Sequence, residues 1–184
     1  MATISYHWTG RHRSLTMAVE QLAGPRKLQA FRRAINHTGD KCYTIVKRTL
    51  TKQMGLASQK LFKDGRTLVK RRASGANLEF QIVSHGRAVP MKEFRWRKTA
   101  QGITAYPWNK AHSFKGAFVI KRYGGNLYMR TTAKRFPIEK LLGGNVNKEM
   151  VKDATAAAFE LVVGTSLPAR VEHEVGVITN GIVS

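Results

Sequence analysis

A single cysteine, Cys42, stands among 184 residues, which excludes an internal disulfide and a metal site built from cysteines. No apolar run approaches the roughly 20 residues that span a bilayer, so the sequence predicts no transmembrane helix and no membrane partner. The first residues also lack the basic-then-apolar order of a secretory signal. We therefore expect a soluble intracellular protein.

Acidic side chains are scarce, with 11 Asp and Glu against 32 Lys and Arg, and the net charge is +21. Residues 1–135 hold 28 basic and 5 acidic residues, whereas residues 136–184 hold 4 and 6. An excess this large favours a polyanion or an acidic protein surface as partner. The alternative is a solvated basic face that only keeps the protein soluble.

Motifs for catalysis are absent as well. The sequence has no phosphate-binding GxxxxGK[ST] loop, no GxGxxG after a strand and no HExxH. The six histidines show no ligand spacing, and Glu172-His173-Glu174 is interpreted as a surface triplet. Cys42 falls on an apolar helix stripe, which predicts a small buried thiol rather than a nucleophile. We expect no enzyme, cofactor or metal, although a nuclease built on His37 and Asp40 stays open as a minor alternative.

The length predicts one domain with its own core. Pro25 suits a first helical turn and Gly55 a C-terminal cap, so residues 25–54 are predicted to form a long amphipathic helix with a basic outer face. Gly39 weakens its middle, so a break there is possible. Its predicted apolar stripe is Leu28, Phe31, Ile35, Cys42, Ile45, Thr49 and Leu50.

Downstream, the hydrophobic period changes to that of strands. Alternation predicts a half-buried strand over 78–83 after a strand over 67–72, and hairpins over 95–106 and 117–131. The second hairpin is predicted to turn at Gly124-Gly125, a pair able to adopt positive φ at both positions. Residues 107–115 are expected to form an exposed loop, and Gly143-Gly144 a turn before a last helix. The strands are joined locally, which predicts a mainly antiparallel meander.

The last helix is predicted to begin near Asn147, to end or kink at Pro168 and to resume over 169–175. Its predicted apolar side is Met150, Val151, Ala154, Ala158, Leu161 and Val162. The fold class is therefore α+β, with the C-terminal helix packed on the sheet. We expect an N-terminal arm over 1–13, one domain over 14–176, which opens with a short helix over 14–22, and a C-terminal tail over 177–184.

Clusters of basic residues are the candidate contact sites, because phosphate and carboxylate partners both need them. These are Arg32, Arg33, Lys47, Arg48, Lys52, Lys70, Arg71, Arg72, Arg95, Arg97 and Lys98. Trp8, Trp96 and Trp108 are candidate aromatic anchors of an interface. Aromatics also interleave with basic residues over 94–98 and 121–123, as in single-strand binders, but alternating strands produce the same pattern.

The order and spacing of several segments are distinctive. They run Ala-Ile-Asn-His-Thr at 34–38, Ser-Gly-x-Asn-Leu at 74–78, Pro-x-x-x-Phe at 90–94, Gly-Ala-Phe at 116–118, and Arg-x-Pro-Ile followed by Leu-x-Gly over 135–143. Over residues 28–175, this series resembles the prophage minor tail protein Z family, the tail completion proteins of long-tailed phages.

The resemblance implies a non-enzymatic virion protein, made in the host cytoplasm, that acts where the finished tail meets the head. It implies a ring, six-fold in symmetry, around the DNA channel. Its expected partners are further copies of the chain, the tail terminator, the head–tail connector or neck proteins, and genomic DNA or the tape-measure protein in the channel. Such a ring of cations needs counter-charges, so we hypothesise that the acidic C-terminal region of one subunit approaches the basic helix of the next. A stand-alone basic nucleic-acid-binding protein is the main alternative.

Overall fold

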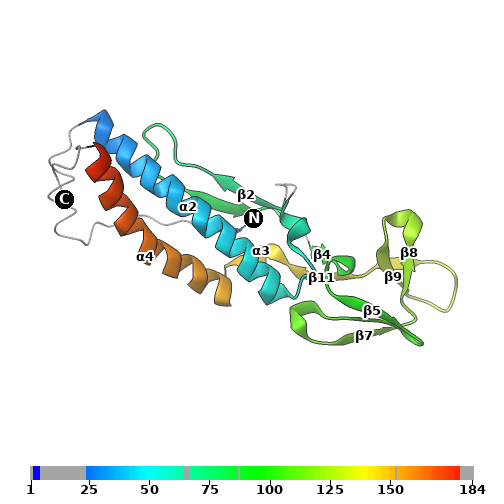
Figure 1. Cartoon of the computed structure of the whole chain (residues 1–184). Helices are drawn as coiled ribbons and strands as arrows, with labels where there is room; N and C mark the ends of the chain where they lie inside the picture. The colour runs from blue at the N-terminus through cyan, green and yellow to red at the C-terminus, as the bar shows by residue number, and fades with distance from the viewer. Residues whose placement is uncertain (1, 5–23, 64–66, 87, 152, 179–184) are drawn as a thin grey trace.

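Two long helices lie side by side along one half of the molecule, and small sheets form the rest (Figure 1). The structure is a computed structural model and describes residues 2–4, 24–63, 67–86, 88–151 and 153–178. The predicted α+β class is confirmed. The predicted helix over 14–22 and Trp8 lie outside the described residues, as do most of the arm and the tail.

Helix α2 (Pro25–Met54) has the predicted bounds. Pro25 begins its first turn, and Gly55 ends it with φ 74° while its N–H bonds to the carbonyl oxygen of Lys52. The helix has no break at Gly39. The ring of Phe80 lies where a Cβ of residue 39 would be, which explains why a glycine stands at this position. The predicted stripe needs correction at Leu28, which is 39% exposed; the buried side also includes Ala34, Thr38, Val46 and Met54.

The strands form four small antiparallel sheets instead of one meander. The first sheet has the order β1 (Ala2–Ile4), β3 (Gln81–Ser84), β2 (Leu68–Arg71), and a second is the pair β11 (Leu142–Asn145) and β4 (Ala88–Pro90). The third has the order β10 (Ile138–Lys140), β9 (Asn126–Arg130), β8 (Phe118–Ile120), and the fourth β5 (Trp96–Thr99), β6 (Gly102–Ala105), β7 (His112–Lys115). Short 3-10 turns span Gln59–Phe62, Met91–Glu93, Pro107–Asn109 and Lys121–Tyr123.

Two strand predictions were wrong in part. Strand β3 begins at Gln81 rather than residue 78, and both Ile82 and Val83 are buried. Successive side chains of a strand point to opposite faces, so both faces of this middle strand are covered and the expected half-burial does not hold. The predicted loop over 107–115 contains β7, which pairs with β6 along its whole length.

The two glycine pairs have different roles. Gly124 and Gly125 have φ 67° and 68°, which confirms a turn that needs glycine. Gly143 and Gly144 lie in β11 instead of a turn. A Cβ on Gly143 would meet the Phe94 ring at 2.4 Å, and one on Gly144 would meet the Trp108 ring at 2.8 Å, so these glycines make room for aromatic rings.

The predicted last helix consists of two helices, α3 (Val146–Met150) and α4 (Asp153–Ile178), with Asp153 at φ 53°. Helix α4 continues through Pro168 without ending, and it packs against α2 rather than on a sheet. Its buried side also differs from the prediction, since Leu161 is 67% exposed. That side recurs every four residues at Thr155, Phe159, Val163, Leu167, Val171 and Val175.

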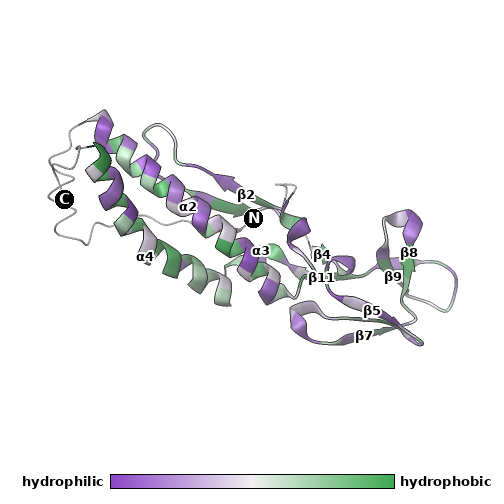
Figure 2. Cartoon of the chain, in the orientation of Figure 1, coloured by the Kyte–Doolittle hydropathy of each residue, from purple (hydrophilic) through white to green (hydrophobic). Residues whose placement is uncertain are grey.

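The described molecule divides into a helical body (residues 24–86 and 146–178) and a β-rich end (residues 88–145). One connected core runs through both parts, but only seven of its 26 buried hydrophobic residues belong to the β-rich end. Figure 2 shows hydrophilic residues recurring along α2 and on β5, whereas the N-terminal half of α4 is mostly apolar. Within the described residues, no helix is both long and apolar enough to cross a membrane.

Candidate interaction surfaces

A groove in the helical body brings together three of the predicted basic residues. Arg32 and Arg33 come from α2, and Arg72 follows β2. The groove is completed by Arg170 and His173 of α4, which the sequence analysis had not assigned to a site. The antiparallel packing of the two helices creates this meeting point, because it places the first turns of α2 beside the last turns of α4.

Glu174 supplies the counter-charge on the α4 side of the groove. Its side chain is 6% exposed, it accepts a hydrogen bond from Arg170, and it lies 3.9 Å from Arg33. The interpretation of residues 172–174 as a surface triplet was therefore wrong for Glu174. A buried carboxylate requires cationic partners, and here two helices of the same chain provide them.

Asp40 holds the end of the first sheet to α2. It accepts hydrogen bonds from Lys70, at 2.6 Å, and from Arg72. Partial burial opposes ionisation of Asp40, but the bonds from Lys70 and Arg72 outweigh it and lower the pKa of the carboxyl. One turn away, Asn36 donates to the carbonyl oxygen of Ala73 at 3.0 Å and accepts from its N–H at 2.9 Å. Two of the predicted basic residues thus serve attachment of the sheet.

His37 lies at the rim of the same groove, three residues before Asp40 in the sequence. Partial burial, followed by the positive charges of Arg170 and Lys41, lowers the pKa of His37 and favours its neutral form. Among the described residues, no group of three or more His, Cys, Asp or Glu side chains is arranged to hold a metal ion. Asp40 is engaged by two cations, so the residues proposed for a nuclease are not arranged as free metal ligands.

The remaining predicted residues of the body have separate surroundings. The Nζ atom of Lys47 lies 4.9 Å from the centre of the Tyr43 ring, and that of Lys70 lies 5.6 Å from it, so both cations contact the ring face. Arg48 and Lys52 are exposed on the outer side of α2, and Arg71 is exposed on β2.

The β-rich end carries the second candidate surface. Strand β5 is the edge of its sheet, and Trp96, Arg97 and Lys98 are all exposed on it, with Arg95 just before. Residues 88–145 contain 12 Lys and Arg but only two carboxylates, Glu93 and Glu139. Of these twelve cations, only Lys92 lies within 4.0 Å of a described carboxylate, Glu93. The positive charge of this end is therefore mostly uncompensated by the carboxylates that the structure describes.

The two described tryptophans belong to this region but do not form one cluster with the basic groove. Trp96 is 37% exposed on β5, and Trp108 is 40% exposed in the turn before β7. Trp108 has φ 51°, and its ring lies against Gly144. Part of each ring is thus available to a partner, as an interface anchor requires.

Asn109 connects the helical body to the β-rich end. Its amide donates to the carbonyl oxygen of Lys52 at 2.9 Å, and its side-chain oxygen accepts from Arg95 at 2.7 Å. The end of α2 is thereby tied to the start of β5. The sequence offered a weak signal for this role, because an asparagine tolerates the positive φ of 60° found here.

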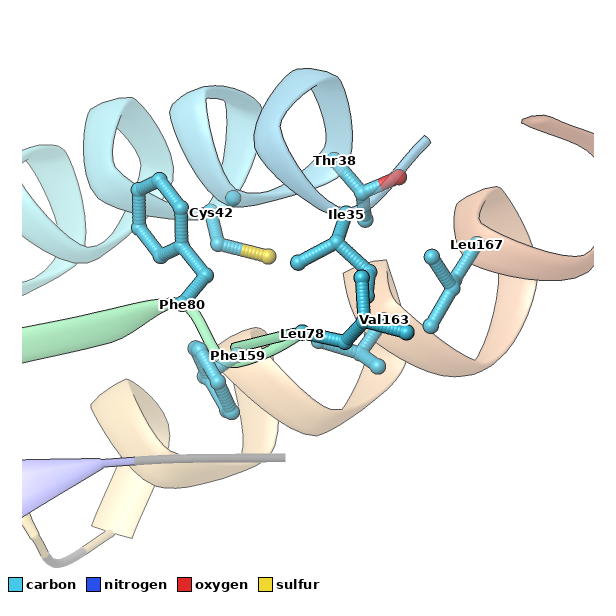
Figure 3. A pocket seen from close by; sticks show the side chains of 9 residues that line it. Ile35, Thr38, Cys42, Leu78, Phe80, Phe159, Val163 and Leu167 are labelled. Carbon is cyan, nitrogen blue, oxygen red and sulfur yellow. The ribbon is translucent and has the colours of Figure 1, made fainter. Parts of the chain in front are cut away.

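A cavity of about 40 Å³ lies between α2, α4 and the segment before β3 (Figure 3). Apolar side chains dominate its lining, to which Cys42 contributes its thiol. Burial raises the pKa of Cys42 to about 11, and the predicted buried thiol is confirmed. A protonated, shielded thiol is not a nucleophile at neutral pH. The volume suits one or two water molecules rather than a substrate.

Sequence reasoning missed Asn36, Asn109, Arg170 and Glu174, and all of these except Arg170 pair across long separations. Besides the weak signal at Asn109, Arg170 and Glu174 carried a local signal, since oppositely charged residues four apart on a helix tend to pair.

No known family model matches this chain. No curated protein matches it either. The same holds for solved structures, none of which is similar.

Proposed function

We propose that this chain is a structural protein of a phage virion, which completes the head-proximal end of the tail and joins it to the neck. In this role the protein acts by complementary shape and charge, and none of its residues is catalytic. The family resemblance over residues 28–175 supports a position at the head–tail junction. The surface charge supports binding to partners of opposite charge.

The observation that carries the proposal is the imbalance at the β-rich end. This end has twelve Lys and Arg residues and two carboxylates, and the structure describes all of its residues. Only one pair of opposite charges among them, Lys92 and Glu93, lies within 4.0 Å. Self-repulsion of such a surface destabilises the isolated protein, so a partner with negative charge is favoured. In a head–tail junction, acidic neighbours or the DNA in the channel would be that partner.

Interrupting the reading frame in the phage or prophage that carries it tests the proposal. We expect complete tails and DNA-filled heads that fail to join, as seen by electron microscopy, and rescue by the wild-type chain supplied from a plasmid. Joined, infectious virions from the interrupted genome would overturn the proposal.

A stand-alone nucleic-acid-binding protein is the second candidate, favoured by the exposed Trp96, Arg97 and Lys98 on one edge strand. It predicts that the chain alone binds duplex DNA with a log–log salt slope of about −0.9 for each neutralised phosphate. It also predicts normal particle assembly without the chain, which distinguishes it from the first proposal.

A further inference from the structure

Helix α4 is apolar on two opposite sides, and only one of them is covered by described residues. Its inner side packs against α2 through Phe159, Val163 and Leu167. Apart from Glu160, its outer face exposes uncharged residues, and Leu161 at 67% exposure is the most exposed large hydrophobic residue described. A helix that is apolar all round is usually covered all round. The outer face of α4 consists of Ala154, Ala157, Glu160, Leu161, Gly164 and Thr165.

Unpaired carboxylates border this outer face. Asp153, Glu160 and Glu172 are exposed on α4, and no described Lys or Arg lies within 4.0 Å of any of them. No Lys or Arg occurs between residues 153 and 169 of a chain whose net charge is +21. The N-terminal part of α4 is thus the stretch of the described molecule where another cationic surface meets least repulsion.

A further acceptor lies on the same face. Pro168 has no N–H, so the carbonyl oxygen of Gly164 loses its usual donor four residues ahead. Gly164 is exposed, and nothing lies within 4 Å of the position a Cβ would take. A partner can therefore approach the helix backbone closely at this position.

The outer side of α2 has the opposite character. Lys41, Arg48 and Lys52 are exposed there, and no described carboxylate lies within 4.0 Å of them. Lys41 and Arg48 are seven residues apart, as are Asp153 and Glu160. Seven residues make two helical turns and about 10 Å of rise, so two pairs of charges match along two helices laid together.

We propose that the outer face of α4 in one copy of the chain packs against the Lys41, Arg48 and Lys52 side of α2 in a second copy. Leu161 fills the centre of this contact, and Glu160 pairs with Lys41 or Arg48. The inference rests on the proposed function in one respect, since it names the surface through which copies would join into a ring. It also changes our hypothesis that the acidic C-terminal region of one subunit approaches the basic helix of the next. Glu174 already pairs within its own chain, so the acidic contribution comes from the N-terminal part of α4 instead.

A charge swap in the purified full chain tests this contact, with sedimentation velocity over a range of concentrations as the measurement. Glu160→Lys and Lys41→Glu should each weaken self-association about tenfold or more, because each places like charges together. Mixing the two variants should restore association, since each then offers the charge that the other lacks. Glu139→Lys, an exposed carboxylate of β10, is the matched control and should have no effect.

Leu161→Glu should also prevent association, whereas Leu142→Glu, at an exposed leucine of β11, should not. Circular dichroism spectra matching wild type establish that each variant is folded. Failure of the mixture to recover overturns the proposal, as does a wild-type chain that stays monomeric at every concentration. Stronger association of Glu160→Lys alone would indicate an α4–α4 contact and would overturn it too. If the contact is found but phage particles assemble normally without the chain, the proposed function fails and this inference stands.

Discussion

The helical body and the β-rich end carry positive charge in different ways. In the body, Glu174 holds Arg33 and Arg170, and Asp40 holds Lys70 and Arg72. The β-rich end contains twelve Lys and Arg residues but only two carboxylates. The body also contains 21 of the 28 buried hydrophobic residues. The difference separates two tasks: the paired cations of the body hold elements of the fold together, whereas most cations of the β-rich end have no described carboxylate within 4.0 Å and serve contacts with partners in the function that we propose.

Shortening a buried side chain between α2 and α4 is expected to have the largest effect on the free energy of unfolding. Phe159→Ala removes a ring that is 5% exposed and enlarges the existing cavity, which should lower the free energy of unfolding by about 3–5 kcal/mol. Urea denaturation measures this. Phe136→Ala, at an exposed ring of the β-rich end, should change it by less than about 0.5 kcal/mol. Equal losses would contradict the concentration of stability in the body.

Two helical glycines should respond in opposite directions. Gly39→Ala should destabilise by about 1–3 kcal/mol, because the new Cβ would meet the Phe80 ring at 2.3 Å and overpacking outweighs helix propensity. Gly164→Ala, with open space around it, should stabilise by up to about 1 kcal/mol. Thermal denaturation of both variants gives the signs. A more stable Gly39→Ala variant would mean that Phe80 does not fix α2 against the first sheet.

Acid should weaken the attachment of the first sheet to α2. The pKa of Asp40 is lowered in the folded state, so the unfolded chain takes up the proton first and stability falls as pH drops below about 4. Exposed ion pairs of this kind contribute about 0.2–1 kcal/mol each. Asp40→Asn should be less stable than wild type at pH 7, and the difference in free energy of unfolding should narrow as the pH falls below about 4, by urea denaturation. A difference that stays constant over this range would show that ionisation of Asp40 is unimportant.

Neutral substitutions on β5 should leave stability almost unchanged and alter binding instead. Arg97→Gln and Lys98→Gln should change the free energy of unfolding by less than about 0.5 kcal/mol. Each should reduce the log–log salt slope for a duplex DNA probe by about 0.9, if its charge faces phosphate. Lys70→Gln is the control, because that cation is already paired with Asp40. An equal reduction for Lys70→Gln would contradict the division of tasks between the two regions.

Local signals in the sequence were enough for α2. Pro25, Gly55 and the amphipathic period gave both of its ends, and Gly124-Gly125 gave a turn. Local signals were not enough for α4, because this helix carries apolar residues on more than one side. The period of its apolar residues therefore does not select the side that is buried. Gly143-Gly144 was misread because only the rings of Phe94 and Trp108, which the chain brings in from elsewhere, explain these glycines.

The candidate basic residues were found by composition, but their roles were not. Whether a cation is held within the chain or left for a partner depends on carboxylates far away in sequence, such as Asp40 for Arg72 and Glu174 for Arg33. Composition shows the excess of Lys and Arg over Asp and Glu, but it cannot show which cations are paired with a carboxylate.

Cys42 makes the seam between the two long helices observable. Its thiol is fully buried, and its pKa of about 11 keeps it protonated at neutral pH. A thiol reagent can reach it when α2, α4 or the segment before β3 moves away, so the labelling rate of the native protein reports how often this part of the core opens. Because this is the only cysteine in the chain, the native sequence carries its own single-site reporter of internal motion.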